Sequence, residues 1–81
     1  MASVAVEAAG WAGTACVLVA YFLLTRGKMT SASRVYQALN LIGALLIGLN
    51  SLINRAYPSV GVNVVWSIIA LYGLWKALQA T

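Results

Sequence analysis

The chain has 81 residues and a net charge of +4, and 63% of its residues are hydrophobic while only 7% are charged. Soluble domains contain roughly 25% charged residues. A chain this short buries only about 60% of its unfolded surface when it folds in water. The composition therefore excludes a soluble globular domain and predicts that residues 1–81 form one membrane domain with the lipid bilayer as its main partner.

The counts of reactive residues limit the chemistry. The chain has no His, one acidic residue, Glu7, and one cysteine, Cys16. It cannot form an internal disulfide, a Cys/His metal site or a pair of catalytic carboxylates. Its basic residues stand between apolar runs, whereas nucleic-acid binding needs them clustered on one face. We therefore expect no enzyme activity, no cofactor, no metal and no nucleic acid.

Three uncharged stretches, at about 8–25, 35–54 and 57–75, predict transmembrane helices. As helices they would be roughly 27 to 30 Å long, which matches a hydrocarbon core of about 30 Å. The stretches lack the alternation of apolar and polar residues that membrane strands show. The predicted fold class is all-α, an integral membrane three-transmembrane-helix bundle.

The basic residues predict the orientation of these helices. Arg26, Lys28 and Arg34 flank the first connection, whereas Arg55 alone marks the second. The positive-inside rule then places the first connection and the C-terminus in the cytoplasm and the N-terminus outside. The same three residues of the first connection are candidates for binding anionic lipid headgroups.

Local signals predict how the helices begin and end. Gly27 is expected to stop the first helix, and Pro58 suits the first turn of the third. The first stretch lacks a basic segment before it, so we expect it to be retained rather than cleaved as a signal peptide. Glu7 suits a first helical turn, where the helix dipole favours a carboxylate. Pairing of Glu7 with Arg55 and a role in proton transport are alternative hypotheses.

Each predicted helix carries small or polar residues at three- and four-residue steps, which place them on one face. These residues are Ala9, Gly13, Cys16 and Ala20; Asn40, Gly43, Ile47, Asn50 and Asn54; and Ser59, Asn63, Trp66, Ala70 and Gly73. Small residues let membrane helices approach closely, so Gly13, Gly43 and Gly73 are the expected packing positions.

Two interpretations fit the polar residues Asn40, Asn50, Asn63 and Trp66. They can form hydrogen bonds between helices, or they can line a place for a small neutral polar solute. Counting from the helix ends puts Asn50 and Asn63 at matching depths in the outer third of the membrane, where they could share one role. Three helices enclose little interior, so we expect a homo-oligomer or a larger membrane protein complex.

Five segments distributed along the chain resemble a known group. They are GWAGT (10–14), AYFLL (20–24), YQALNLIG (36–43), YPSVGVNVVW (57–66) and LYGLW (71–75). Together they are similar to a family of short, uncharacterised bacterial three-helix membrane proteins. The resemblance implies a multi-pass protein of the bacterial inner (cytoplasmic) membrane.

The chain is also similar to the SemiSWEET half-transporters of the PQ-loop group. These have three helices, a basic first loop, an outside N-terminus and an asparagine on the third helix, where Asn63 falls here. The resemblance implies that two copies surround a pathway with Asn63 facing the solute. The Pro-Gln pair of that group is absent, and Tyr21-Phe22-Leu23-Leu24 stands on the first helix instead.

The function predicted from the sequence is that of an oligomerising or accessory subunit of a membrane assembly. The alternative is a SemiSWEET-like half-transporter for a small neutral polar solute.

Overall fold

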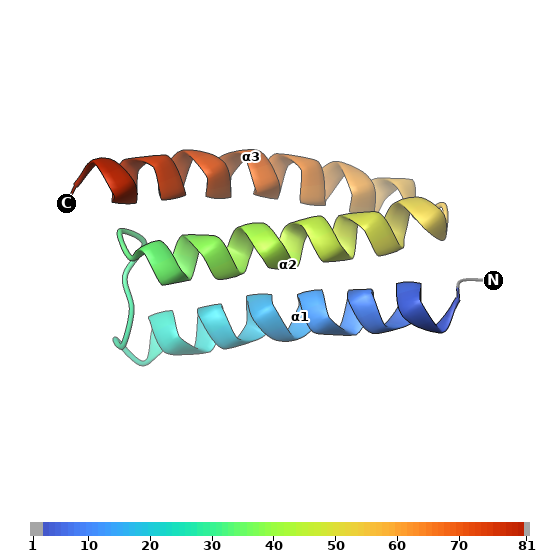
Figure 1. Ribbon diagram of the computed structural model, residues 1–81, viewed down its shortest axis with the longest axis horizontal. Helices are drawn as coiled ribbons and strands as arrows, with labels where there is room; N and C mark the ends of the chain where they lie inside the picture. The colour runs from blue at the N-terminus through green and yellow to red at the C-terminus, as the bar shows by residue number, and fades with distance from the viewer. Residues whose placement is uncertain (1–2, 81) are drawn as a thin grey trace.

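The computed structural model describes residues 3–80, which form three α-helices. They are α1 (Val4–Thr25), α2 (Arg34–Ile53) and α3 (Tyr57–Gln79), each antiparallel to the next (Figure 1). The last turn of α3 lies at the end with the α1–α2 connection, and the first turn of α1 lies at the end with the α2–α3 hairpin. All three helices are long and apolar enough to cross a membrane.

The first turn of α1 and the last turn of α3 extend beyond the uncharged stretches of the sequence. Glu7 lies in the first turn of α1, and Lys76 lies in the last turn of α3. A negative charge near a helix N-terminus and a positive charge near a C-terminus are both favoured by the helix dipole. These two charges therefore lie inside the helices instead of bounding them.

The connections follow the expected local signals. Gly27 ends α1 with a φ of 75°, a left-handed conformation that glycine adopts without strain. Pro58 lies in the first turn of α3. Ser33 is the N-cap of α2, but its hydroxyl accepts a hydrogen bond from the Thr30 N–H in the connection and makes none to the helix.

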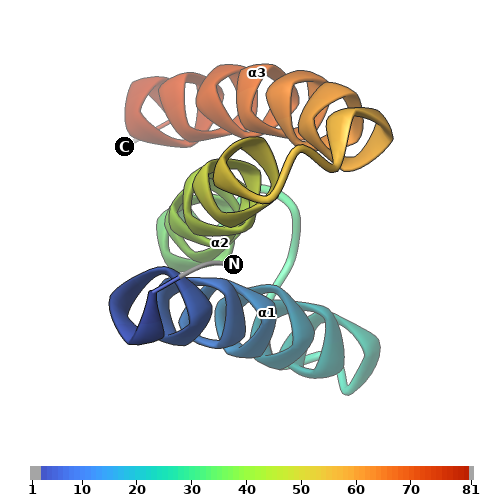
Figure 2. The ribbon, with the colours of Figure 1, turned by 90° about the vertical axis from the view of Figure 1, so that its right-hand side faces the viewer.

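The helices form an open layer with α2 in the middle (Figure 2). Within the described residues, α2 packs against α1 on one side and α3 on the other, while α1 and α3 do not pack against each other. Among residues 3–80, the buried hydrophobic residues are all alanines: Ala20, Ala44, Ala70 and Ala77. Because the interfaces use small side chains, the large apolar ones remain on the surface, where lipid can cover them.

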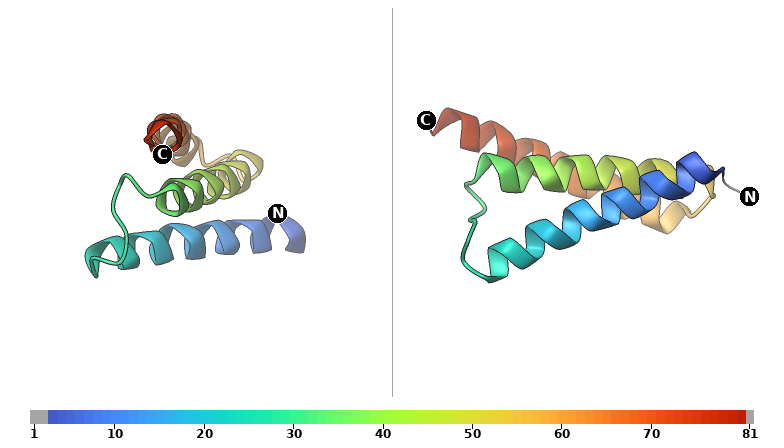
Figure 3. Two further views of the ribbon diagram at one scale, coloured as in Figure 1. Left: turned by 60° about the vertical axis from the view of Figure 1, so that its left-hand side comes forward. Right: turned by 60° about the horizontal axis from the view of Figure 1, so that its bottom comes forward.

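The closest approach of α1 and α2 depends on two glycines. A Cβ on Gly13 would lie 2.8 Å from the Gly43 carbonyl oxygen, and a Cβ on Gly43 would lie 2.9 Å from the Gly13 carbonyl oxygen. α1 crosses α2 obliquely, and the two helices diverge toward the first connection (Figure 3). Gly13 and Gly43 thus face each other where the helix backbones meet.

Replacing Gly13 by alanine should destabilise the protein, because the new methyl group meets backbone that cannot move aside. We expect Gly13→Ala to lower the free energy of unfolding by about 1 to 3 kcal/mol, as overpacking does. The measurement is a denaturing-detergent titration of the purified protein in mild micelles.

Gly61→Ala is the matched control, because a Cβ on Gly61 has no neighbour within 4 Å. It should leave stability unchanged or raise it by up to about 1 kcal/mol, the helix propensity difference between the two residues. Equal losses in both variants would contradict the close contact at Gly13.

Candidate functional site

Asn50 joins α2 to α1. Its Nδ2 donates a hydrogen bond of 2.9 Å to the carbonyl oxygen of Val6. The amide fits there because the facing position is a glycine: a Cβ on Gly10 would lie 2.7 Å from Asn50 Nδ2. This hydrogen bond, from a side chain of α2 to the backbone of α1, joins the end of α2 to the first turns of α1.

Asn40 and Trp66 join α2 to α3. The Trp66 Nε1 donates to Asn40 Oδ1 at 3.0 Å, and Asn40 Nδ2 donates to the Tyr36 carbonyl oxygen at 2.9 Å. Asn40 is 5% exposed, whereas Trp66 is 46% exposed. The indole therefore lies partly on the surface of the protomer, with its N–H bonded inward.

Asn63 lies on α3 beside Gly48 of α2. Its Nδ2 donates to the Ser59 carbonyl oxygen at 2.8 Å and to the Ser59 hydroxyl at 3.3 Å. The Ser59 hydroxyl is itself 2.7 Å from the Ser51 hydroxyl across the α2–α3 interface. No donor within residues 3–80 reaches Asn63 Oδ1, which leaves one acceptor of this amide unused.

Asn50 and Asn63 do not share one contact in the structure. Asn50 bonds to α1, and Asn63 bonds within α3 next to the other side of α2. The equal depth expected from the sequence does not bring the two amides together, because Asn50 lies at the α1–α2 interface and Asn63 lies on the opposite side of α2. A shared role for this pair has no support in the geometry.

The predicted polar residues also line three separate hollows. Asn50 lines one between α1 and α2. Asn40 and Trp66 line a second, of about 260 Å³, with Ser31, Tyr36, Gln37, Ile69 and Ala70. Asn63 lines a third, of about 340 Å³, whose other walls are Ala44, Leu45, Gly48, Leu49, Leu52, Val60, Val64, Ser67 and Ile68. The four residues therefore do not converge on a single cavity within the described protomer.

Gln37 is a polar residue that the sequence analysis missed. Its side chain occupies the space where a Cβ on Gly73 would lie, and its Nε2 donates to the Ser31 carbonyl oxygen at 2.7 Å. Gly73 thus faces a side chain of α2, whereas Gly13 and Gly43 face each other's backbone. Gln37 could have been identified from its position three residues before Asn40, because residues three apart lie on the same side of a helix on neighbouring turns.

Charge is unevenly divided between the two ends of the layer. Arg26 and Lys28 are exposed in the first connection, and Arg34 is exposed at the start of α2. Lys76 lies at the same end, with its Nζ 6.0 Å from the centre of the Tyr72 ring. The opposite end holds Arg55 in the hairpin and Glu7 on α1.

Glu7 takes a partner that the sequence analysis did not predict. Its Oε1 accepts a hydrogen bond of 3.3 Å from Trp11 Nε1, one helical turn further along α1. The two residues are four apart, the spacing at which side chains on one helix meet. The structure thus shows a contact with Trp11 where pairing with Arg55 had been one hypothesis.

The hydrogen bond between Trp66 and Asn40 should be visible as an energetic coupling. We expect a double-mutant cycle with Trp66→Phe and Asn40→Leu to give a coupling of about 0.6 to 2 kcal/mol, the range of such bonds between membrane helices. The free energies come from the same detergent titration. Additive effects would contradict the bond.

Asn50→Leu combined with Asn63→Leu is the control cycle. The two amides lie at different interfaces and share no bond, so their effects should add within about 0.5 kcal/mol. Strong coupling between them would contradict the separation seen in the structure.

Comparison with known proteins adds a family and no function. No curated protein and no solved structure gives a significant match to the chain. The model of an uncharacterised protein family matches residues 6–81, which include nearly all of α1 and the whole of α2 and α3. Since this match spans most of the sequence, the chain belongs to that family.

Proposed function

We propose that the protein is a subunit of a membrane assembly that associates with copies of itself or with a larger membrane protein, and that it catalyses no reaction. The open layer supports this proposal. α1 and α3 each pack on α2 alone, so both outer helices keep a face for a neighbour. An accessory role needs such faces and needs no reactive site.

The main support for the proposal is Asn63 Oδ1, which accepts no hydrogen bond from residues 3–80. This amide lies in the groove between α2 and α3, whose other walls are mostly apolar. Lipid tails offer no hydrogen-bond donor, so an unused polar group at membrane depth raises the free energy. A donor from a neighbouring helix would remove this cost and contribute about 0.6 to 2 kcal/mol to association.

The distribution of charge supports an orientation for this subunit. Arg26, Lys28, Arg34 and Lys76 lie at one end, and positive residues are retained on the cytoplasmic side of membranes. We place that end and the C-terminus in the cytoplasm, with the N-terminus outside, in the bacterial inner membrane. Arg26, Lys28 and Arg34 would then lie at the level of anionic lipid headgroups.

A half-transporter for a small neutral polar solute is the second candidate. The hollow of about 260 Å³ favours it, because the side chains of Gln37, Asn40 and Trp66 line this space together. One protomer leaves α1 and α3 apart, so a closed pathway would need a second copy. Both proposals therefore require association, and only this one requires water at Asn40.

Asn63→Leu should weaken association between copies, because it removes the unused acceptor. Energy transfer between donor- and acceptor-labelled copies in liposomes, followed as lipid dilutes them, measures this. We expect about 3- to 30-fold weaker association, which corresponds to about 0.6 to 2 kcal/mol.

Asn54→Leu is the matched control, since Asn54 is an exposed amide whose Nδ2 bonds to the Asn50 carbonyl oxygen of its own helix. It should associate like the unchanged protein. Equal loss in both variants would contradict the role of Asn63, and no energy transfer in the unchanged protein would rule out self-association.

Thiol accessibility separates the two candidate functions. In a Cys16→Ala background, Asn40→Cys should react slowly with a membrane-impermeant thiol reagent if the protein is an accessory subunit, because this position is buried between helices. Ser31→Cys, in the exposed connection, serves as the reactive control. Rapid labelling at both positions would support the transporter and contradict the accessory role.

A further inference from the structure

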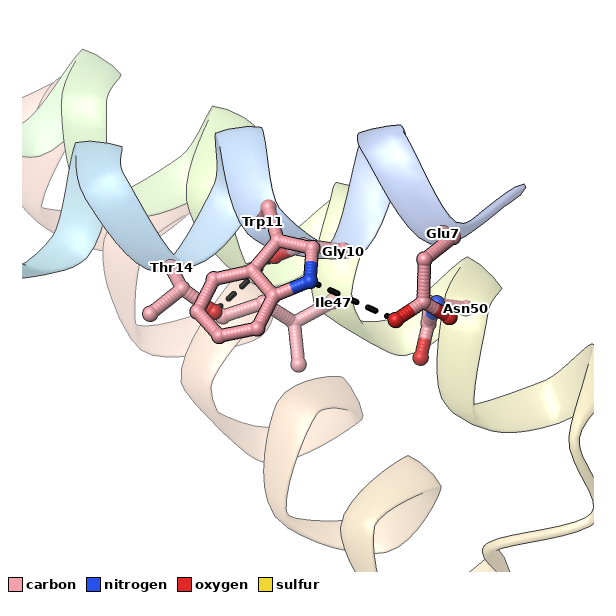
Figure 4. A pocket seen from close by; sticks show the side chains of 6 residues that line it. All are labelled: Glu7, Gly10, Trp11, Thr14, Ile47 and Asn50. Atoms are coloured by element: carbon pink, nitrogen blue, oxygen red, sulfur yellow. Dashed lines mark hydrogen bonds between the residues drawn. The ribbon is translucent and has the colours of Figure 1, made fainter. Parts of the chain in front are cut away.

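A polar hollow between α1 and α2 is not used by the proposed assembly. It is open to the surface, has a volume of about 180 Å³ and is lined by Glu7, Gly10, Trp11, Thr14, Ile47 and Asn50 (Figure 4). It lies beside the first turns of α1, at the end of the layer that holds the α2–α3 hairpin. The single acidic residue of the chain is therefore part of its wall.

Each side-chain donor group of this hollow already makes one hydrogen bond within the protein. Trp11 Nε1 donates to Glu7 Oε1 at 3.3 Å, and the Thr14 hydroxyl donates to the Gly10 carbonyl oxygen at 2.9 Å. Asn50 Nδ2 donates to the Val6 carbonyl oxygen at 2.9 Å. Apart from the second N–H of the Asn50 amide, the positions left over are acceptors: the second carboxylate oxygen of Glu7, the Asn50 Oδ1 and the lone pairs of the Thr14 hydroxyl.

The charged residue in the lining of this hollow is Glu7, so the charge of the lining is negative. None of the five Lys and Arg residues of the chain lines it. A carboxylate with further acceptors in the same lining favours a ligand that is positively charged and rich in N–H donors, because charge-assisted hydrogen bonds are the strong ones. The indole of Trp11, held next to the carboxylate, adds the attraction of an aromatic face for a cation.

We propose that this hollow binds a primary ammonium group. Such a group carries three N–H donors, and the side chains of Glu7, Thr14 and Asn50 in the lining offer acceptors for them. The volume is below the roughly 300 to 1,000 Å³ of pockets for drug-sized ligands, so the hollow takes a small headgroup and not a large molecule. Two sources have this chemistry: a free alkylamine in the water phase, and the aminoethyl headgroup of a lipid.

The position on α1 suits either source. Glu7 lies in the first turn of a helix long enough to span the membrane, which places it near the headgroup layer. Trp11 is 68% exposed one turn deeper, where amphipathic rings are favoured. This proposal is independent of the assembly role, because it uses the α1–α2 side of the layer and Asn63 lies on the other.

The test uses the indole N–H of Trp11 as a reporter, observed by nitrogen-15 NMR of the full chain in phosphatidylcholine nanodiscs. Ethylamine should shift the Trp11 signal in a saturable way and leave the signals of Trp66 and Trp75 in place. Tetramethylammonium, which has the charge without N–H donors, should bind about tenfold or more weakly. Replacing part of the lipid by phosphatidylethanolamine tests the lipid source.

Either source supports the site. A shift with ethylamine alone assigns a free amine, whereas a shift with phosphatidylethanolamine that blocks the ethylamine response assigns the lipid headgroup. Absence of a saturable Trp11 shift with both would overturn the proposal. A response to ethylamine no different from that to the same concentration of sodium chloride would also overturn it.

Glu7→Gln is the decisive variant, because it removes the charge and keeps an oxygen that can accept from Trp11. It should weaken binding by about tenfold or more. Unchanged Trp66 and Trp75 signals show that the variant still folds. Asn54→Leu, whose amide lies outside the hollow, is the control and should bind as before. Equal binding by Glu7→Gln and the unchanged protein would contradict the assignment.

Discussion

The central helix α2 holds a helix on each of its two sides, and it does so with small side chains. Apolar side chains gain nothing by leaving lipid for a protein interface, so contact between membrane helices depends on close packing and on hydrogen bonds. Gly13 and Gly43 bring two backbones together, and Ala44 and Ala70 are buried in the interfaces. Larger residues at these positions would force the layer apart.

The same arrangement decides where the polar groups lie. An amide in hydrocarbon needs partners, and α2 shares its amides between both neighbours: Asn50 bonds to α1, and Asn40 accepts from Trp66 of α3. These bonds join the layer without creating a central cavity. Asn63 and Glu7 are different, since within residues 3–80 their side chains form hydrogen bonds only inside their own helices, and each lines a hollow, on opposite sides of α2. This is why we assign association to one side and cation binding to the other.

Much of the architecture could be predicted from the sequence, because charges interrupt the apolar runs at helix-sized intervals. The packing glycines were also predictable from their spacing.

The arrangement of the helices could not be predicted, because spacing shows which residues share a face, but not whether α1 and α3 meet. Asn40 and Asn50 show the consequence, since at about 100° per residue ten residues place them about 80° apart. On a central helix that angle is enough to direct one toward α3 and the other toward α1. The Glu7–Trp11 contact could have been predicted, because residues four apart meet on one face of a helix. The hollow beside it could not, because it depends on how α2 lies against α1.

We propose that this open layer works in association with another membrane protein chain. Native mass spectrometry of the protein, extracted at its natural abundance in lipid nanodiscs or mild detergent, tests this most directly. We expect a defined complex, either several copies of the chain or a fixed stoichiometry with a larger membrane protein. A single copy carrying lipid alone, under conditions that preserve known membrane complexes, would contradict it.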